Sequence, residues 1–125
     1  MSVVYILEDD DIMAGCIAGA IKKAGKSVKI KHFKDAISAI QNLDSNNLPK
    51  IIFLDILLTG PDGFTFLNEL ASYDDTNKIP IVIISSLDFT GKDLSSYNVI
   101  GILNKETMYP ADIQKFIKEY LSDAH

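Results

Sequence analysis

The sequence of 125 residues contains one cysteine, no tryptophan and no apolar stretch long enough to cross a membrane. The single Cys16 excludes an internal disulfide and a metal site built from several cysteines, and it fits a reducing compartment. A membrane span needs about 18 apolar residues, and Met1 leads into a strand pattern without the basic segment of a secretory signal. We therefore expect a cytoplasmic protein.

Basic residues are outnumbered by acidic ones. The chain has 12 lysine and arginine residues against 17 acidic residues, which gives a net charge of −5 and a pI near 4.8. This balance argues against a surface for the phosphate backbone of a nucleic acid, so the expected partner is a protein. The length suits one domain with a full hydrophobic core, and we expect residues 1–125 to form it.

Short apolar runs alternate with helical patterns along the chain. Strands are predicted over residues 3–7, 28–33, 81–86 and 99–103, and within the apolar run 51–58. Apolar residues at helical spacing predict helices over 12–21, 36–43, 66–71 and 113–121, with a short, weak helix within 87–98. Alternation with strands that are apolar on both faces is typical of an α/β fold, in which helices cover both faces of a parallel sheet.

Smaller signals mark the ends of elements. Asp10 or Asp11 is expected to cap the first helix, and Asp62-Gly63 is expected to be structural turn chemistry. Cys16 falls in the apolar stripe of the first helix, so we expect it to be a small core residue. His32 is expected to be an edge-strand residue rather than a ligand.

Polar side chains stand at the ends of the predicted strands. Glu8 and Asp9 follow the first strand, Asp55 interrupts the third apolar run, Ser85 lies at the end of the fourth strand, and Lys105 follows the fifth. Ligands of open parallel sheets bind at the carboxyl ends of the strands, so these residues are expected to meet in one pocket. An unpartnered Asp55 would be costly in an apolar strand, so it needs a metal, a cation or an exit into solvent.

Three carboxylates in one pocket repel one another unless a hard cation with oxygen ligands is bound. Mg²⁺ suits this set best, because it binds one or two carboxylates, keeps several waters and leaves room for a phosphate. Once the charge is neutralised, Asp55 is a competent nucleophile toward a phosphoryl group. Ser85 and Lys105 can then stabilise the phosphoryl oxygens, so the residues predict phosphoryl transfer to Asp55.

This set resembles the site of a response-regulator receiver domain of two-component signalling, the CheY-like family, and the resemblance covers essentially the whole chain. The matching residues are Glu8, Asp9, Asp55, Asp62, Gly63, Ser85 and Lys105. The resemblance implies a doubly wound, five-stranded parallel sheet of the flavodoxin-like (βα)5 type with strand order 2-1-3-4-5.

The resemblance also implies a role for each site residue. Asp55 would be the phosphoacceptor, with Mg²⁺ held by Asp9, Asp55 and the backbone carbonyl of Leu57, and with Glu8 acting through water. The phosphoryl donor would be a sensor histidine kinase or a phosphotransfer protein, and a downstream protein would read the result. A monomer or weak homodimer, without an output domain and without binding to membrane or nucleic acid, is expected. It would be no enzyme, although it would assist its own phosphorylation and dephosphorylation.

Several positions depart from the usual pattern of the family. Thr59 stands where the family has Pro, with Pro61 displaced; Ser86 replaces a usual Ala; Ile102 replaces the aromatic switch residue; and Glu106 replaces the Pro that follows the lysine across a cis bond. The segment from Ser85 to Lys105 is also slightly short. The peptide bond after Lys105 is therefore expected to be trans, and the usual switch relay and fourth-helix output face are in doubt.

Two other functions compete with the phosphoacceptor switch. One is a constitutive protein-binding module that keeps the site but has lost the switch, which the departures at Ile102 and in the fourth-helix segment motivate. The other is a phosphatase of the haloacid-dehalogenase type, which needs a second Asp two residues after the first, where this chain has Leu57. Simpler roles also exist for Ser85, as a strand-end hydroxyl, and for Lys105, as a surface lysine.

Overall fold

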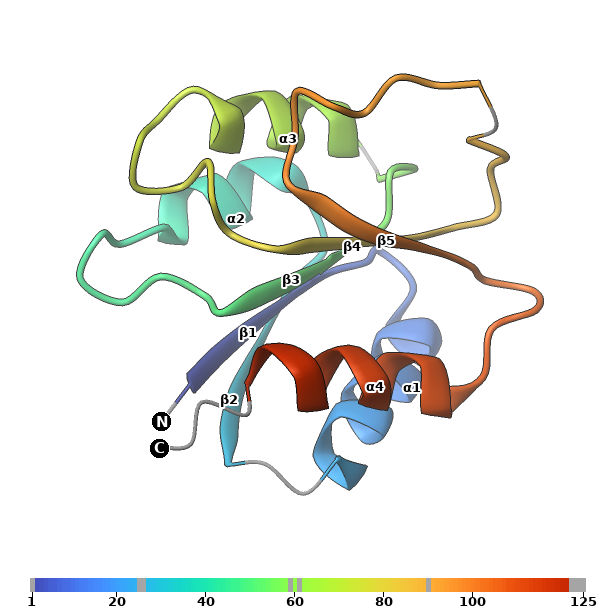
Figure 1. The fold of residues 1–125 in the computed structure, drawn as a ribbon. Coiled ribbons are helices and arrows are strands. Elements are labelled where there is room, and N and C mark those ends of the chain that lie inside the picture. The colour runs from blue at the N-terminus through green and yellow to red at the C-terminus, as the bar shows by residue number, and fades with distance from the viewer. Residues whose placement is uncertain (1, 25–26, 59, 61, 90, 122–125) are drawn as a thin grey trace.

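The computed structural model describes residues 2–24, 27–58, 60, 62–89 and 91–121, and these form five strands and four helices (Figure 1). The elements in chain order are β1 (Ser2–Leu7), α1 (Asp11–Lys23), β2 (Val28–Phe33), α2 (Ala36–Asn42), β3 (Ile51–Leu54), α3 (Gly63–Ala71), β4 (Ile81–Ser85), β5 (Val99–Asn104) and α4 (Pro110–Tyr120). No helix among the described residues is long and apolar enough to span a membrane.

The five strands form one parallel sheet in the order β2-β1-β3-β4-β5. This confirms the predicted doubly wound α/β fold and its strand order. The central strands β1, β3 and β4 are buried along nearly their whole length, as their continuous apolar runs predict. The edge strands β2 and β5 contain only partly buried and exposed residues.

Helices cover the sheet on both faces (Figure 1). On one face α2 and α3 pack through Ala36, Ala39, Phe66 and Leu67 onto alternate residues of β1, β3 and β4. On the other face α1 and α4 pack onto the intervening residues of the same strands. Each strand side chain therefore enters one of two cores, because successive strand residues point to opposite faces.

Gly101 brings α4 close to the edge of the sheet. A Cβ atom at this position would lie only 2.4 Å from the Phe116 ring, so the absence of a side chain lets the ring rest on β5. Phe116 is partly buried against the cluster under α1 and α4. A larger residue at this position would push the Phe116 ring away from β5.

The buried face of α1 differs from the prediction. Ala14, Ile17, Ala20 and Ile21 are buried, whereas Ile12 is 80% exposed and Cys16 is also exposed. The expectation of Cys16 as a core residue is therefore wrong. The predicted positions Ile17, Ala20 and Ile21 are buried, but Ala14 completes the inner stripe in place of Ile12 and Cys16.

The short helix expected within 87–98 is also wrong. The described residues of this segment form turns, in which the amide of Lys92 donates to the carbonyl of Phe89 and the side chain of Asp93 accepts from the amide of Ser95. Asp and Ser side chains compete with helical hydrogen bonds in this way, and Gly91 adopts a positive φ of 79° that ends any helical run.

Candidate functional site

The predicted site residues stand at the carboxyl edge of the sheet. Glu8 and Asp9 follow β1, Asp55 follows β3, Ser85 ends β4, and Lys105 follows β5. The amide of Asp55 donates to the carbonyl of Leu7 at 2.9 Å, and the amide of Lys105 donates to the carbonyl of Ser85 at 3.1 Å. The backbone hydrogen bonds between neighbouring strands therefore continue into the site and fix the positions of Asp55 and Lys105.

Lys105 joins two buried carboxylates. Its Nζ atom lies 2.8 Å from Oδ2 of Asp55 and 2.9 Å from Oε1 of Glu8, and it donates to Oε2 of Glu8 at 3.1 Å. Glu8 is 1% exposed and Asp55 is 3% exposed, so both charges depend on partners inside the protein. Lys105 is thus a member of the site and not an ordinary surface lysine.

Local backbone groups hold the two carboxylates in place. The amide of Leu57 donates to Oδ1 of Asp55 at 3.0 Å, which folds residues 55–57 into a tight turn beneath the carboxylate. The amide of Asp10 donates to Oε2 of Glu8 at 3.2 Å. Asp55 leaves the strand at its buried end, which explains how an apolar run can contain a carboxylate.

Burial and charge act against each other in this pocket. Burial raises the pKa of the Glu8 carboxyl and the charge of Asp55 adds to the rise, while hydrogen bonds from Lys105 and Asp10 oppose it. Burial lowers the pKa of Lys105, but hydrogen bonds to Asp55 and Glu8 outweigh this, so the pKa of the ammonium is raised. Lys105 therefore stays positively charged between the two carboxylates.

The carboxylates of Glu8, Asp9 and Asp55 are close enough to share a cation. One oxygen of each lies within 4.8 Å of the other two. Oε1 of Glu8 is buried and accepts no well-aligned hydrogen bond, although Lys105 Nζ lies 2.9 Å away. Three carboxylates that can each offer an oxygen to one point fit a hard divalent cation.

Ser85 is buried at the end of β4, with its hydroxyl in two possible roles. Its Oγ atom accepts a hydrogen bond from the amide of Leu87 at 3.2 Å. This is the simpler role considered above, in which the hydroxyl pairs with a backbone group at the end of the strand. Accepting that bond leaves the hydroxyl proton free to be donated. Ser85 can therefore offer a hydrogen bond at this edge while it also orders the turn to Leu87.

The segment after Asp55 is anchored by the turn predicted at Asp62-Gly63. The side chain of Asp62 caps α3 by accepting from the amides of Phe64 and Thr65. The amide of Gly63 donates to the carbonyl of Ile56 at 2.8 Å, and a Cβ atom at Gly63 would lie 2.7 Å from Ile56 Cα. This close approach confirms the structural role of the pair. The departures at Thr59 and Pro61 lie outside the described residues.

The structure adds contacts around the site that the sequence predicted only in part. Nε2 of His32, on the edge strand as expected, lies 2.6 Å from the backbone carbonyl of Glu8, so β2 supports the backbone of the site. Asp10 is the residue that caps α1. None of the described peptide bonds is cis, which agrees with the trans bond expected after Lys105.

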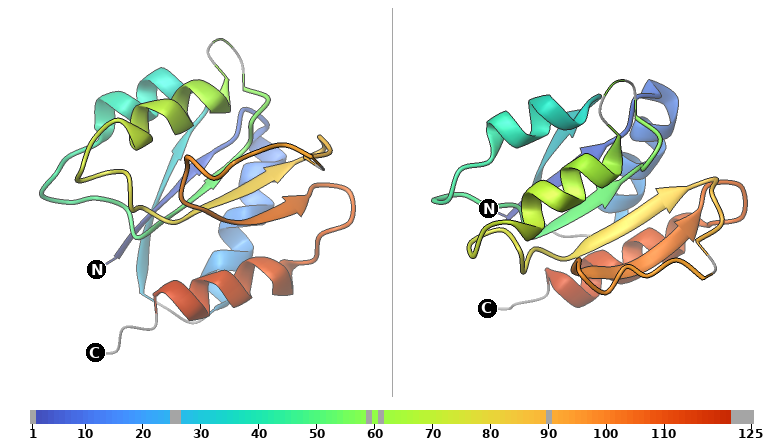
Figure 2. Two further views of the ribbon diagram at one scale, coloured as in Figure 1. Left: turned by 45° about the horizontal axis from the view of Figure 1, so that its top comes forward. Right: turned by 90° about the horizontal axis from the view of Figure 1, so that it is seen from above.

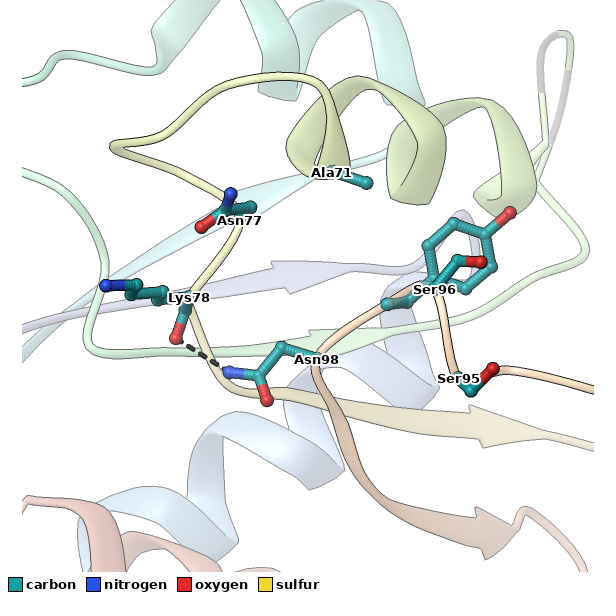
Figure 3. A pocket seen from close by; sticks show the side chains of 7 residues that line it. Ala71, Asn77, Lys78, Ser95, Ser96 and Asn98 are labelled. Carbon is teal, nitrogen blue, oxygen red and sulfur yellow. Dashed lines mark hydrogen bonds between the residues drawn. The ribbon is translucent and has the colours of Figure 1, made fainter.

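A second polar hollow lies at the other end of the sheet (Figure 3). It is lined by Ala71, Asn77, Lys78, Ser95, Ser96, Tyr97 and Asn98, and the side-chain amide of Asn98 donates to the carbonyl of Lys78 at 2.7 Å. These residues precede β4 and β5, whereas the acidic cluster lies beyond the other ends of the strands. The hollow is therefore separate from the candidate site.

Comparisons with known proteins identify relatives of this chain. The family model of the response regulator receiver domain matches residues 4–118. Over 86 residues the chain is 34% identical to the response regulator PleD of Caulobacter vibrioides, and the match covers 69% of this chain and 19% of PleD. The chain thus spans about a fifth of the length of this relative.

Solved structures share the fold at low identity. The response regulatory domain of protein mrkE from Klebsiella pneumoniae has a TM-score of 0.80 at 18% identity, with 96% of this chain and 95% of that chain covered. The receiver domain of sensor histidine kinase PA1611 from Pseudomonas aeruginosa has a TM-score of 0.79 at 16% identity, with 98% of each chain covered. The latter structure has a magnesium ion coordinated in its active-site cleft.

Proposed function

The chain belongs to the family of response regulator receiver domains of two-component signalling, and on this premise we propose that it is a phosphoacceptor switch in which Asp55 receives the phosphoryl group. Receiver domains typically interact with histidine kinases or phosphotransfer proteins. The observation that supports the proposal is the placement of Asp55 within 4.8 Å of two further carboxylates and 2.8 Å from the Lys105 ammonium.

The chemistry follows from the groups around Asp55. A carboxylate oxygen forms a bond to phosphorus while the bond from phosphorus to the nitrogen of a donor phosphohistidine, or to the leaving oxygen of a small acyl phosphate, breaks. The leaving group takes the electron pair of the broken bond. Lys105 and the Ser85 hydroxyl are placed at the same edge to stabilise phosphoryl oxygens. Water later releases phosphate and restores the Asp55 carboxylate.

A divalent cation would neutralise charge on the phosphoryl oxygens when it is bound. The donor set fits such an ion, and we assign it to Mg²⁺, held by Asp9, Asp55 and the carbonyl of Leu57, with Glu8 contributing through water. We assign the domain no separate substrate, so it is not an enzyme beyond assisting its own phosphorylation and dephosphorylation. A sensor kinase or phosphotransfer protein as donor, and a cytoplasmic location, complete the proposal.

Intact mass spectrometry after incubation with acetyl phosphate and Mg²⁺ tests the proposal. The native chain should gain the mass of one phosphoryl group, and Asp55→Asn should gain none. Asp62→Asn is the matched control, because Asn retains the capping role of this exposed residue and the site is untouched. Its phosphorylation should equal that of the native chain.

The chain could accept a phosphoryl group only from its own kinase and would then gain no mass from acetyl phosphate. Beryllofluoride tests this case, because it mimics the aspartyl phosphate without any phosphoryl donor. We expect it to raise the melting temperature of the native chain in the presence of Mg²⁺ but not that of Asp55→Asn. The proposal is wrong if the folded native chain neither gains mass nor responds to beryllofluoride. It is equally wrong if Asp55→Asn is phosphorylated as well as the native chain.

A further inference from the structure

The C-terminal ends of α2 and α3 lie next to each other on one face of the sheet. Figure 2 shows the two helices side by side and running in the same direction, so the loops after them leave on the same side. A hollow of about 280 Å³ opens there, between the end of α2, the loop before β3 and the turns after α3, and we call it the α2–α3 hollow. Both loops lead into the first residues of strands, so the hollow lies at the end of the sheet opposite to the acidic cluster.

The floor of the α2–α3 hollow is apolar. Ile40 and Leu43 at the end of α2 and Leu48 in the loop before β3 line it. All three are partly buried against the core under α2 and α3, so they are held in place from below. The hollow is smaller than the roughly 300–1,000 Å³ of a pocket for a drug-sized ligand, and its size suits one long side chain.

The rim of the hollow carries two carboxylates. Glu69, in the last turn of α3, and Asp75, in the turns beyond it, both line the hollow, and none of the described residues that line it is basic. Within the described part of the chain, neither carboxylate forms an ion pair. Glu69 is also partly buried, so a cation brought into the hollow would interact with it under reduced solvent screening.

The two helix ends add negative potential at the same place. Carbonyl groups in the last turn of a helix carry a partial negative charge, which a nearby cation stabilises. The last turn of α1 contains Lys22 and Lys23 and that of α4 contains Lys118, whereas the last turns of α2 and α3 contain no basic residue. The α2–α3 hollow is therefore the place where two helix ends lack the cation that the other two helices supply themselves.

An aromatic ring stands beside the carboxylates on an ordered turn. Tyr73 lines the hollow and is 54% exposed. The buried hydroxyl of Thr76 donates to the carbonyl of Leu70 at 2.7 Å. The amide of Asn77 donates to the carbonyl of Tyr73 at 2.9 Å. These bonds hold the turn that presents the ring, and the face of such a ring attracts a planar cation.

An apolar floor, two carboxylates and an exposed ring together match an arginine side chain. Its methylene stem can lie on apolar surface, while its guanidinium donates to carboxylates in a planar fork and stacks on an aromatic ring. All 12 basic residues counted in this sequence are lysines, so a second copy of the chain has no arginine to supply. The occupant that fits is therefore a segment of another protein.

We propose that the α2–α3 hollow binds an arginine side chain presented by a partner protein, with its stem on the apolar floor and its guanidinium facing Glu69 and Asp75. This goes beyond the proposed phosphorylation of Asp55. The hollow lies at the other end of the sheet, and binding there needs neither the carboxylate of Asp55 nor a bound divalent cation.

NMR chemical shifts of the backbone amides, followed while a peptide is added to the full chain, test the proposal. The probe is a capped peptide with one central arginine between two leucines and with Gly and Ser at its ends. It should bind with a dissociation constant of about 1 mM or below and shift the amides of Leu43 and Asp75. A peptide with citrulline in place of arginine keeps the shape but not the charge, and it should bind at least about tenfold more weakly.

Two neighbouring aspartates separate the hollow from the general acidity of the chain. Asp75→Asn should weaken binding of the arginine peptide about tenfold, because a charge-assisted hydrogen bond is lost, and Glu69→Gln should act in the same direction. Asp74→Asn is the matched control, since Asp74 is exposed and carries the same charge but does not line the hollow. Its affinity should stay within about twofold of the native value at physiological salt.

Four results would overturn the proposal. The first is no shift at Leu43 and Asp75 with millimolar peptide, and the second is equal binding of the arginine and citrulline peptides. The third is an equal loss in Asp75→Asn and Asp74→Asn, which would reduce the interaction to attraction by net charge. The fourth is propylguanidinium binding as tightly as the peptide, which would assign the hollow to a free small cation. Asp55→Asn should bind the peptide normally, so failure of the phosphoacceptor proposal stays distinguishable from failure of this one.

Discussion

Replacing Lys105 with methionine removes the ammonium group that lies between two buried carboxylates. Methionine has a side chain of similar length but carries no charge. Glu8 and Asp55 therefore lose the ammonium that lies 2.9 Å and 2.8 Å from their carboxylate oxygens. Removing one partner of a buried ion pair costs about 3–5 kcal/mol. Because the Lys105 side chain is 19% exposed, solvent offsets part of this, and we expect a loss of about 2–4 kcal/mol in the free energy of unfolding.

Urea unfolding followed by far-ultraviolet circular dichroism, at neutral pH without divalent cations, measures this loss. With a urea dependence of about 2 kcal/mol per molar, the midpoint should fall by about 1–2 M. Lys34→Met is the matched control, because Lys34 pairs with Asp11 at 3.0 Å while the two side chains are 58% and 69% exposed. An exposed pair of this kind contributes about 0–1 kcal/mol.

Comparing the loss of unfolding free energy in the two variants shows whether the buried carboxylates depend on the Lys105 ammonium. If Lys105→Met costs no more than Lys34→Met, the buried carboxylates do not depend on the ammonium and the reasoning is refuted. Added Mg²⁺ should restore part of the stability of Lys105→Met, because a bound cation would supply the missing positive charge. Mg²⁺ should have no such effect on the difference between Lys34→Met and the native chain.

Two further predictions concern the turn after Asp55 and the lifetime of the phosphoryl group. Gly63→Ala should destabilise the chain by about 1–3 kcal/mol in urea, because the added methyl meets Ile56 Cα at 2.7 Å. A Cβ atom added at Gly15 would meet no atom within 4 Å, so Gly15→Ala should instead stabilise α1 by about 0.5–1 kcal/mol. Equal effects of the two substitutions on stability would refute the packing argument. Leu57 and Leu87 are 53% and 41% exposed beside the site and can neither orient nor activate water, so self-dephosphorylation should be slow. The double variant Leu57→Asn, Leu87→Glu should lose phosphoryl mass about tenfold faster or more, and slower loss than in the native chain would contradict this.

The strand pattern and the site residues were accessible to sequence reasoning because each rests on local chemistry. Continuous β-branched and apolar runs predict β1, β3 and β4, and the polar residue that ends each run marks the carboxyl edge of the sheet. The helix caps at Asp10 and Asp62 follow from side chains that bond their own backbone. These effects act within a few residues, and the sequence alone reports them.

The expectations for Cys16 and for the 87–98 segment failed for a different reason. Both elements have weak local preferences, so packing decides them. Alanines close to the sheet turn Cys16 outward, and the turns around Asp93 leave β5 without a helix on one face. Helical periodicity alone cannot choose between faces of similar hydrophobicity, or between a weak helix and a turn.

The sequence by itself determined the parallel α/β fold and the identity of the five polar residues at its carboxyl edge. Only the tertiary structure decided that Lys105 contacts both Glu8 and Asp55, which lie 97 and 50 residues away along the chain. It also decided that Ile102 faces an open groove and that His32 supports the backbone of Glu8. The physical reason is that burial and ion pairing depend on which strands become neighbours, and that property belongs to the packed sheet.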